Sequence, residues 1–472
     1  MKKLIYKISV LAISGTMLFT ACTKDFTVQS PSDSVPSNEA LNTLSSLGNA
    51  LNGVYSQLRA VSLYGRDFAV SGDLQADNTY VEIKNSGRYL AQYNYSVTAA
   101  DAVAGEMWSA AYSGIQRANQ IINSTVTTTG VASIKAQALA ARALLYFKLV
   151  NIYARPYTDN PAALGVPIVL TYQPYLLPTR NTVKEVYTQI VSDLQSALKD
   201  APAYVNSVTL NKYAIEGLLA RVYLYMGDNT DAKAAAVDVI KNSRFSLVSA
   251  GNYTAFWSNP AIQSDQTEVM FEVDVDVINN NGYDDVAAIY INGYQDIYAS
   301  SQLFNLYTAT DVRRGLMLSG KTKSGASAYL VNKFPNALNA DRDNLKVIRL
   351  SEVYLIAAEA SLPTDNASAQ TYLNTLMAQR DPGFQYTSTG NQLLNDIINE
   401  RRKELAFEGD RFYDLNRLKL PIARVSNPGA IPAGQGNVNL NIPYSDYRRI
   451  APIPQAELQA NANIVSQQNP GY

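Results

Sequence analysis

The stretch at residues 394–417, LNDIINERRKELAFEGDRFYDLNR, combines a helical apolar pattern with a dense run of charges. Its apolar residues recur at the spacing of one helix face: Leu394, Ile397, Ile398 and Leu405. Gly409 marks the residue where we expect this helix to end. Arg401 falls on the same apolar face, and a guanidinium cannot lose its charge. The pattern therefore predicts that Arg401 has a carboxylate partner.

Carboxylates are plentiful around this arginine. The segment from Glu400 to Arg417 holds five acids and five bases. The acids are Glu400, Glu404, Glu408, Asp410 and Asp414. A solvated helix face would also explain such a run, but large apolar residues interleave with the charges at Phe407, Phe412, Tyr413 and Leu415. We interpret the segment as a partly buried structural ion network.

Three segments in order carry a family resemblance. Residues 400–417, ERRKELAFEGDRFYDLNR, resemble the C-terminal signature of the SusD/RagB family, and residues 349–360, RLSEVYLIAAEA, resemble its preceding helix. Residues 452–472 resemble its closing segment, with Pro452-Ile453-Pro454, Glu457 and Gln468-Asn469-Pro470-Gly471-Tyr472. This family comprises surface nutrient-binding lipoproteins of Bacteroidetes that work beside SusC-like TonB-dependent transporters. The resemblance implies a mainly α fold of tetratricopeptide-like helix pairs with loop-rich insertions and few short strands.

The N-terminus has the pattern of an export signal. Residues 1–21 begin with lysines and continue into a short apolar run that cannot span a bilayer. Cys22 is the single cysteine of the chain, and its place after this run resembles a lipobox, although Phe19 stands where leucine is more usual. We expect residues 1–21 to be a lipoprotein signal peptide and Cys22 to be lipidated. The polar residues 22–38 read as a flexible tether.

Helical periodicity dominates the body of the chain. Leucines and a tyrosine recur at helical spacing from Leu44 to Leu58, and Thr182 with Glu185 forms a capping-box pattern ahead of another helix. The pattern A-R-x-x-L-Y occurs at residues 141–146 and 220–225. Such internal similarity is typical of stacked helix pairs. We expect an N-terminal helical part at residues 39–250. The second part, residues 251–472, should hold a loop-rich insertion, the last repeat and the signature, within the same compact unit.

Composition argues against several classes of function. The chain has no histidine, so a Ser-His-Asp or Cys-His arrangement and a histidine-containing zinc site are excluded. We find neither a phosphate-binding glycine-rich loop nor a dinucleotide fingerprint, and we expect no cofactor. A formal net charge of −1 gives no basic footprint for nucleic acid. A glycosidase needs only two carboxylates, but no pair stands out. We expect a protein that is not an enzyme and does not bind nucleic acid.

One group of acids could suggest a metal site. Asp274, Asp276, Asp284 and Asp285 surround the turn at residues 279–282. Their spacing does not fit a calcium-binding EF-hand loop. We interpret the segment as a strand that runs into an Asn-Gly turn, and we expect no metal.

Tyrosine is unusually frequent, at 32 residues against 12 phenylalanines. A phenol presents a flat apolar face to a sugar ring and a hydroxyl to its polar edge. Many tyrosines fall in two interruptions of the helical pattern, Gly65–Gly105 and Gly251–Asp343. The resemblance places glycan-contacting aromatics in these two regions. The ligand-binding residues that we predict are Tyr89, Tyr93, Tyr290 and Tyr294 as stacking faces, Asp73 and Arg88 as polar groups that orient the sugar, and Asp77 and Trp257 in reserve.

The resemblance also implies partners and a location. We expect an outer-membrane lipoprotein that faces the cell exterior, captures an oligosaccharide and delivers it to a SusC-like TonB-dependent transporter. Two alternatives stay open: a peptide-binding, RagB-like member of the family, and a repeat scaffold that binds only protein. The sequence does not identify the sugar.

Overall fold

The structure is a computed structural model of the whole chain. It describes residues 41–173, 175–434 and 440–472. Cys22 and the predicted signal peptide and tether lie outside the described residues. Within these ranges, every helix is either too short or too polar to span a bilayer.

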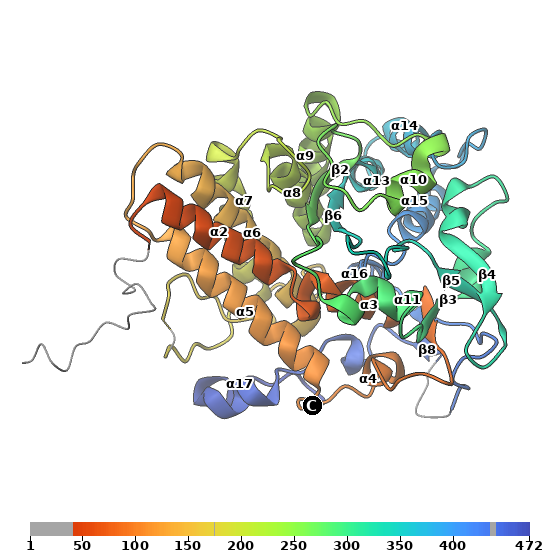
Figure 1. Cartoon of the computed structure of the whole chain (residues 1–472), viewed down its shortest axis with the longest axis horizontal. Helices are drawn as coiled ribbons and strands as arrows, with labels where there is room; N and C mark the ends of the chain where they lie inside the picture. Colours follow the sequence, from red (N-terminus) through yellow and green to blue (C-terminus); the bar gives the residue numbers. More distant parts are fainter. Residues whose placement is uncertain (1–40, 174, 435–439) are drawn as a thin grey trace, which may run out of the picture.

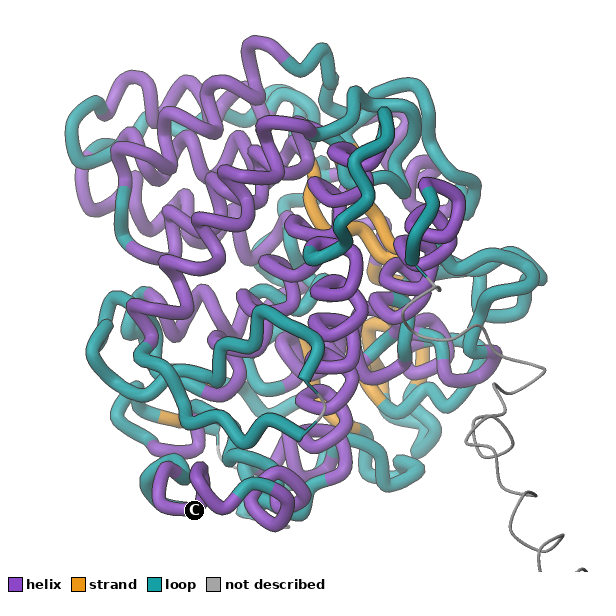
Figure 2. Tube along the Cα trace, turned by 90° about the vertical axis from the view of Figure 1, so that its left-hand side faces the viewer, coloured by secondary structure: helices purple, strands orange, loops and turns teal. Residues whose placement is uncertain are grey.

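A stack of helices runs from the left side of the molecule to its upper right (Figure 1). Its members are α2 (Leu44–Leu58), α5 (Ala102–Ile122), α6 (Val131–Tyr153), α7 (Val183–Asp200), α8 (Lys212–Met226), α9 (Asn229–Asn242), α13 (Leu350–Ser361), α14 (Asn366–Met377) and α15 (Gly390–Glu404). From α5 onward, each member packs against the next as far as α15, and α2 packs against α5 and α6. Helices dominate the chain trace, and the strands are short (Figure 2). The predicted mainly α fold of helix pairs is confirmed.

The helix ends follow local sequence signals. Thr182 Oγ1 accepts a hydrogen bond from the Glu185 amide, and Glu185 accepts one from the Thr182 amide, so the predicted capping box begins α7. Gly227 ends α8 in the left-handed region with φ of +76°. The side chain of Asp228 then caps α9. This sharp turn lets α8 and α9 pack side by side as one helix pair.

The repeated A-R-x-x-L-Y motif places one buried arginine between neighbouring helices in each copy. Arg142 in α6 donates two hydrogen bonds to Asp193 in α7, at 2.7 and 2.8 Å. Arg221 in α8 bonds both carboxylate oxygens of Glu352 in α13. A bidentate pair of this kind fixes the distance and orientation of two packed helices.

The strands are short and form small sheets. Strands β1 (Thr79–Val81), β3 (Ile297–Ala299), β5 (Ser327–Val331) and β4 (Met317–Lys321) form an antiparallel sheet in that order. Tyr80 pairs with Tyr298, and their rings stack with centroids 5.8 Å apart. Strands β2 (Val269–Val273) and β6 (Leu345–Arg349) form a separate pair that packs on α8. The first sheet joins the two segments that were expected to interrupt the helices.

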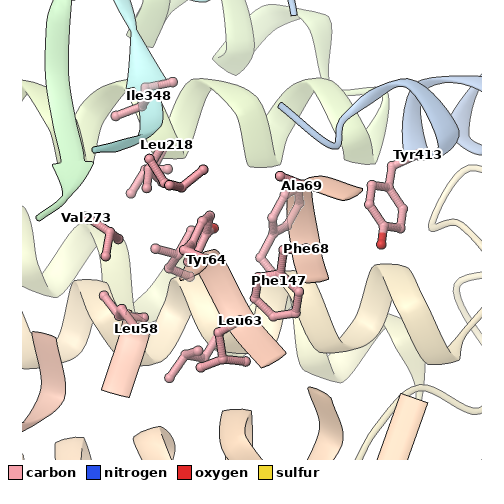
Figure 3. Packing of buried hydrophobic residues seen from close by; sticks show 14 of the residues in the cluster. Leu58, Leu63, Tyr64, Phe68, Ala69, Phe147, Leu218, Val273, Ile348 and Tyr413 are labelled. Atoms are coloured by element: carbon pink, nitrogen blue, oxygen red, sulfur yellow. The ribbon is translucent and has the colours of Figure 1, made fainter. Parts of the chain in front are cut away.

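The beginning of the first interruption is not an exposed loop. It begins with the π-helical turn η2 (Val61–Gly65) and helix α3 (Asp67–Leu74), in which every residue is buried. Tyr64, Phe68 and Ala69 lie among side chains from distant parts of the chain, including Phe147 and Tyr413 (Figure 3). The segment therefore forms part of the central core. Because all its faces are buried, it has no amphipathic pattern to reveal it.

The signature segment closes this core. Helix α15 ends at Glu404, earlier than predicted, because residues 405–409 form a turn with positive φ at Phe407 and Gly409. Gly409 touches α3: a Cβ atom on Gly72 would lie 1.9 Å from the Gly409 carbonyl oxygen. Helix α16 (Arg411–Arg417) follows. The two glycines permit an approach of backbones that no side chain would allow.

A buried ion network surrounds the signature, as the sequence predicts. Glu404 accepts hydrogen bonds from Arg349 at 2.8 Å, Arg380 at 2.9 Å and Arg313 at 3.2 Å. Burial alone would raise the pKa of Glu404, but the three guanidiniums outweigh burial and hold this pKa well below its ordinary value. The network joins α15 to β6 and to the segments that follow α12 and α14.

The remaining short elements complete the described part of the chain. The helices are α4 (Leu90–Asn94), α10 (Tyr253–Ser258), α11 (Val286–Tyr290), α12 (Ser301–Phe304) and α17 (Gln455–Ala460). The last strand pair is β7 (Ile422–Ala423) with β8 (Asn441–Ile442). Arg424 from this tail donates to the backbone carbonyls of Leu74, Ala76 and Tyr93. The tail thus fastens the region that precedes α5.

Candidate functional site

Most of the predicted ligand-binding residues are buried. Their exposed fractions are 0% for Asp73 and Tyr290, 2% for Trp257, 3% for Tyr93, 4% for Tyr89 and 5% for Asp77. A ring must be accessible before a sugar can stack on it. The prediction for these residues is therefore corrected: in this structure they present no face to a ligand. The physical reason is that the supposed loops fold into the core.

The two aspartates hold the backbone of the core. Asp73 accepts hydrogen bonds from the Asn78 side chain at 2.6 Å and from the Gly409 amide at 2.7 Å. Burial raises the pKa of Asp73 to about 6. Asp77 forms a bidentate pair with Arg411, at 2.9 and 3.0 Å. Both carboxylates link the segment around α3 to the signature, so their role here is structural.

The buried aromatic rings pack against cations or against other rings. Trp257 lies beneath Lys333, Lys346 and Arg349, whose charged atoms are 4.2 to 5.1 Å from its ring centroids. Tyr290 stacks on Phe334 and meets Phe407 edge-on. The two remaining rings face arginines: Tyr93 lies under Arg424, and Tyr89 lies under Arg66.

Two predicted residues, Arg88 and Tyr294, are brought together at the surface. The Arg88 guanidinium carbon lies 3.5 Å from the centroid of the Tyr294 ring, and both side chains are partly exposed. These residues come from the two different interruptions of the helical pattern. Arg88 also donates to Ser86 Oγ at 2.9 Å. One face of the Tyr294 ring is thus covered by a cation that retains further N–H donors.

Asp296 fixes the loop that carries Arg88. This buried carboxylate accepts a hydrogen bond from the Ser86 amide at 3.0 Å and pairs with Lys323 at 2.6 Å. Lys323 also donates to the Tyr294 carbonyl at 2.9 Å. The Glu82 amide donates to the Asp296 carbonyl, which extends the pairing of β1 with β3. The sheet therefore sets the position of the Arg88 loop relative to Tyr294.

Tyr283, which the prediction left out, is an exposed aromatic beside this pair. Its side chain is 64% exposed, and its ring lies edge-on to Tyr294 with centroids 6.3 Å apart. The neighbouring Asp284 pairs with Arg66 at 2.7 Å while its side chain remains half exposed. The position of Tyr283 directly after Asn281-Gly282 is a usable signal in the sequence, because the tip of a turn exposes the next side chain. We call Arg88, Tyr283, Asp284, Tyr294 and Lys323 the Arg88 surface.

The acidic turn beside this surface is stabilised by its own hydrogen bonds. Asp276 Oδ1 accepts from the amides of Ile278 and Asn279 at 2.7 and 2.6 Å. Asp285 accepts from the Asn281 amide at 3.0 Å. The Asp276 contacts are those of an Asx-type turn, and the carboxylates of Asp276 and Asp285 both accept hydrogen bonds from backbone amides of this segment.

Comparison with known proteins shows the family. A model described as "Starch-binding associating with outer membrane" matches residues 26–224, and a SusD family model matches residues 317–472. A SusD superfamily crystal structure from Bacteroides thetaiotaomicron is 33% identical, with a TM-score of 0.82 and coverage of 91% of this chain and 100% of that chain. The chain belongs to the SusD/RagB family.

Further members of the SusD/RagB family agree over nearly the full length. A putative sugar-binding protein from Bacteroides vulgatus is 32% identical, with a TM-score of 0.83, and the match covers 92% of this chain and 99% of that chain. SusD-like protein P2 from Formosa agariphila is 29% identical over 91% of this chain and 93% of that protein. SusD/RagB proteins are binding proteins. The description of the family model that matches residues 26–224 names starch binding and association with the outer membrane.

Proposed function

We propose that this protein is a non-catalytic, cell-surface lipoprotein that binds an oligosaccharide at the Arg88 surface and passes it to a SusC-like TonB-dependent transporter. The exposed ring of Tyr283 beside the Arg88–Tyr294 stack carries this proposal. Arg88 comes from the first of the two segments where the family resemblance places glycan contacts, and Tyr283 and Tyr294 come from the second. Membership of a glycan-binding family supports the ligand class.

The Arg88 surface has the groups that a sugar ring needs. The Tyr283 ring offers an apolar face for C–H groups, since it is more exposed than any of the tyrosines predicted from the sequence. Arg88 and Lys323 can donate hydrogen bonds to sugar hydroxyls, and the exposed part of Asp284 can accept them. An aromatic face flanked by donors and an acceptor suits a neutral polyol better than an apolar ligand.

Anchoring is the second part of the proposal. A lipid on Cys22 would hold the protein at the outer membrane, with residues 23–38 as the tether. About 16 extended residues reach roughly 50 Å, so the described domain could stand off the membrane beside a transporter. More than one acyl chain on the cysteine would give stable anchoring.

A glycan screen tests the ligand class. The migration of the purified protein should be retarded in native gels that contain starch, laminarin or another neutral polysaccharide. The protein should also bind neutral oligosaccharides on a glycan array. A peptide library screened in parallel distinguishes a glycan-binding protein from a peptide-binding one. Binding to peptides with no binding to any glycan would reject the proposal.

A further inference from the structure

A second concave surface lies along α5, apart from the Arg88 surface. It is a groove of about 520 Å³ between α5, α17 and a loop that contributes residues 167–173 and 176–178. In Figure 1, α5 and α17 lie on the lower left side of the molecule, away from β3 and β5. The lining residues that matter below are Trp108, Ser113, Gln116, Gln120, Tyr172 and Glu457.

The walls of this groove are fixed from both sides. On the incoming arm of the loop, Tyr112 donates to the Pro167 carbonyl at 2.8 Å, and Asn119 donates to the Val169 carbonyl at 2.9 Å. On the outgoing arm, Asn461 of the C-terminal segment donates to the Pro178 carbonyl at 2.8 Å. Buried side chains thus hold both arms, and the groove is preformed.

The floor of the groove is polar and close to neutral. Ser109, Ser113, Gln116 and Gln120 recur along one face of α5 at intervals of three and four residues. Among the described residues, the enclosed carbonyl oxygen of Gln116 has no hydrogen-bond partner. Because neighbouring atoms cover this oxygen, a ligand O–H or N–H group reaches it only when the Gln116 side chain rotates into the groove, and the oxygen then gains its missing partner.

The rest of the lining adds an aromatic face and balanced charges. Tyr172 is 54% exposed on the loop. Trp108 donates to the Glu457 carboxylate at 3.3 Å, and Arg117 donates to the Gly53 carbonyl at 2.9 Å. The acid Glu457 and the base Arg117 both have hydrogen-bond partners within the protein, and their charges balance. The lining therefore does not favour an ionic ligand.

We propose that this groove is a second binding site for a neutral, hydroxyl-rich ligand, namely a short oligosaccharide segment. The Tyr172 ring stacks on the sugar, and Gln116 and Gln120 bond its hydroxyls. The groove shares no residue with the Arg88 surface, so it goes beyond the proposed function and can bind sugar whether or not the Arg88 surface does.

Tryptophan fluorescence can detect ligand binding in this groove selectively. The chain has two tryptophans, and Trp257 is buried in the core beneath Lys333. Trp108 lines the groove, and the Arg88 surface contains no tryptophan. Titration of the full chain with maltohexaose and with laminarihexaose should change the emission of Trp108. The change should persist in Trp257→Phe and vanish in Trp108→Phe.

Matched variants of the same loop complete the test. Tyr172→Ala should weaken the fluorescence-detected affinity about tenfold or more, and Gln116→Ala should weaken it less. Tyr175→Ala is the control, because Tyr175 is 93% exposed on the same loop and does not line the groove. Tyr283→Ala should leave the Trp108 signal intact, which separates this site from the Arg88 surface. An unchanged Trp108 signal with both hexasaccharides, or equal affinity in Tyr172→Ala and Tyr175→Ala, would overturn the inference.

Discussion

Arg401 in α15 donates to Asp414 in α16 through a hydrogen bond of 3.0 Å, and both side chains are buried. Asp414 also pairs with Arg417, which in turn pairs with Glu359 in α13. The arginine that stood out on an apolar helix face therefore has the carboxylate partner that the sequence demanded. This chain of pairs ties together three helices of the C-terminal half.

Replacing Arg401 should destabilise the fold. Arg401→Ala leaves Asp414 with one cation fewer in a buried setting and should lower the free energy of unfolding by about 3–5 kcal/mol. Chemical denaturation monitored by circular dichroism measures this change. Lys184→Ala, at an exposed position of α7, serves as the control and should melt like the parent. Equal stability of the two variants would show that the network is not the structural element described here.

Acid should unfold the protein through the same network. Burial alone would raise the pKa of Asp414, but Arg401 and Arg417 outweigh it and lower the pKa to about 2. A carboxyl whose pKa is depressed by folding stabilises the native state above its ordinary pKa of 3.8 and loses that contribution as pH falls towards 2. Denaturation curves at pH 7, 4 and 3 should show falling stability. Asp414→Asn should flatten this fall, and a parallel pH profile would argue against the assignment.

Tyr290 should prove to be a core residue. Its hydroxyl has no hydrogen-bond partner within the described ranges, so Tyr290→Phe should keep or raise stability by up to about 1 kcal/mol. Tyr290→Ala should cost about 3–5 kcal/mol, because it leaves a cavity beside Phe334 and Phe407. Melting curves distinguish the two variants. If the Tyr290→Phe variant is stable but no longer binds sugar, Tyr290 contributes to ligand binding and the assignment to the core alone is contradicted.

The sequence revealed periodic elements better than irregular ones. The capping box at Thr182 and the repeated arginines Arg142 and Arg221 stand in local patterns, and the structure confirms the helices that they mark. Helix α3 could not be found in this way, because burial on all sides removes the contrast between its faces. The ion pairs could be expected from charge at apolar positions, but their partners across the chain, such as Glu268 for Arg380, depend on tertiary structure.

The sequence pointed to the two segments that form the proposed binding surface, but not to most of its residues. The family resemblance pointed to both segments that meet at the Arg88 surface, and two of the residues selected there, Arg88 and Tyr294, lie side by side and partly exposed. It could not tell which tyrosines turn inward. Tyr290 and Tyr294 are four residues apart, yet one lies in the core and the other at the surface, because α11 ends between them.

Anchoring has a direct test in cells. Cys22 lies outside the described residues, so its role rests on the sequence. Cys22→Ala should move the protein from the membrane fraction to the soluble fraction without lowering its melting temperature, since the tether is not expected to contribute core contacts. Fractionation should be done in a strain that lacks the transporter partner. Membrane retention of Cys22→Ala in that strain would contradict lipid anchoring.

Sugar binding at the Arg88 surface is tested most directly by calorimetric titration of site variants. The oligosaccharide identified by the screen is titrated into Tyr172→Ala protein, in which binding to the groove along α5 is weakened. It is then titrated into the same protein with Tyr283→Ala or Arg88→Ala added. A shallow site should bind in the millimolar to micromolar range, about 4–8 kcal/mol, and removal of the Tyr283 ring should cost about 1–3 kcal/mol with an unchanged melting temperature. Tyr175→Ala in the same background should bind like its parent. If the Tyr283→Ala and Arg88→Ala proteins also bind like their parent, the Arg88 surface is not the sugar-binding site.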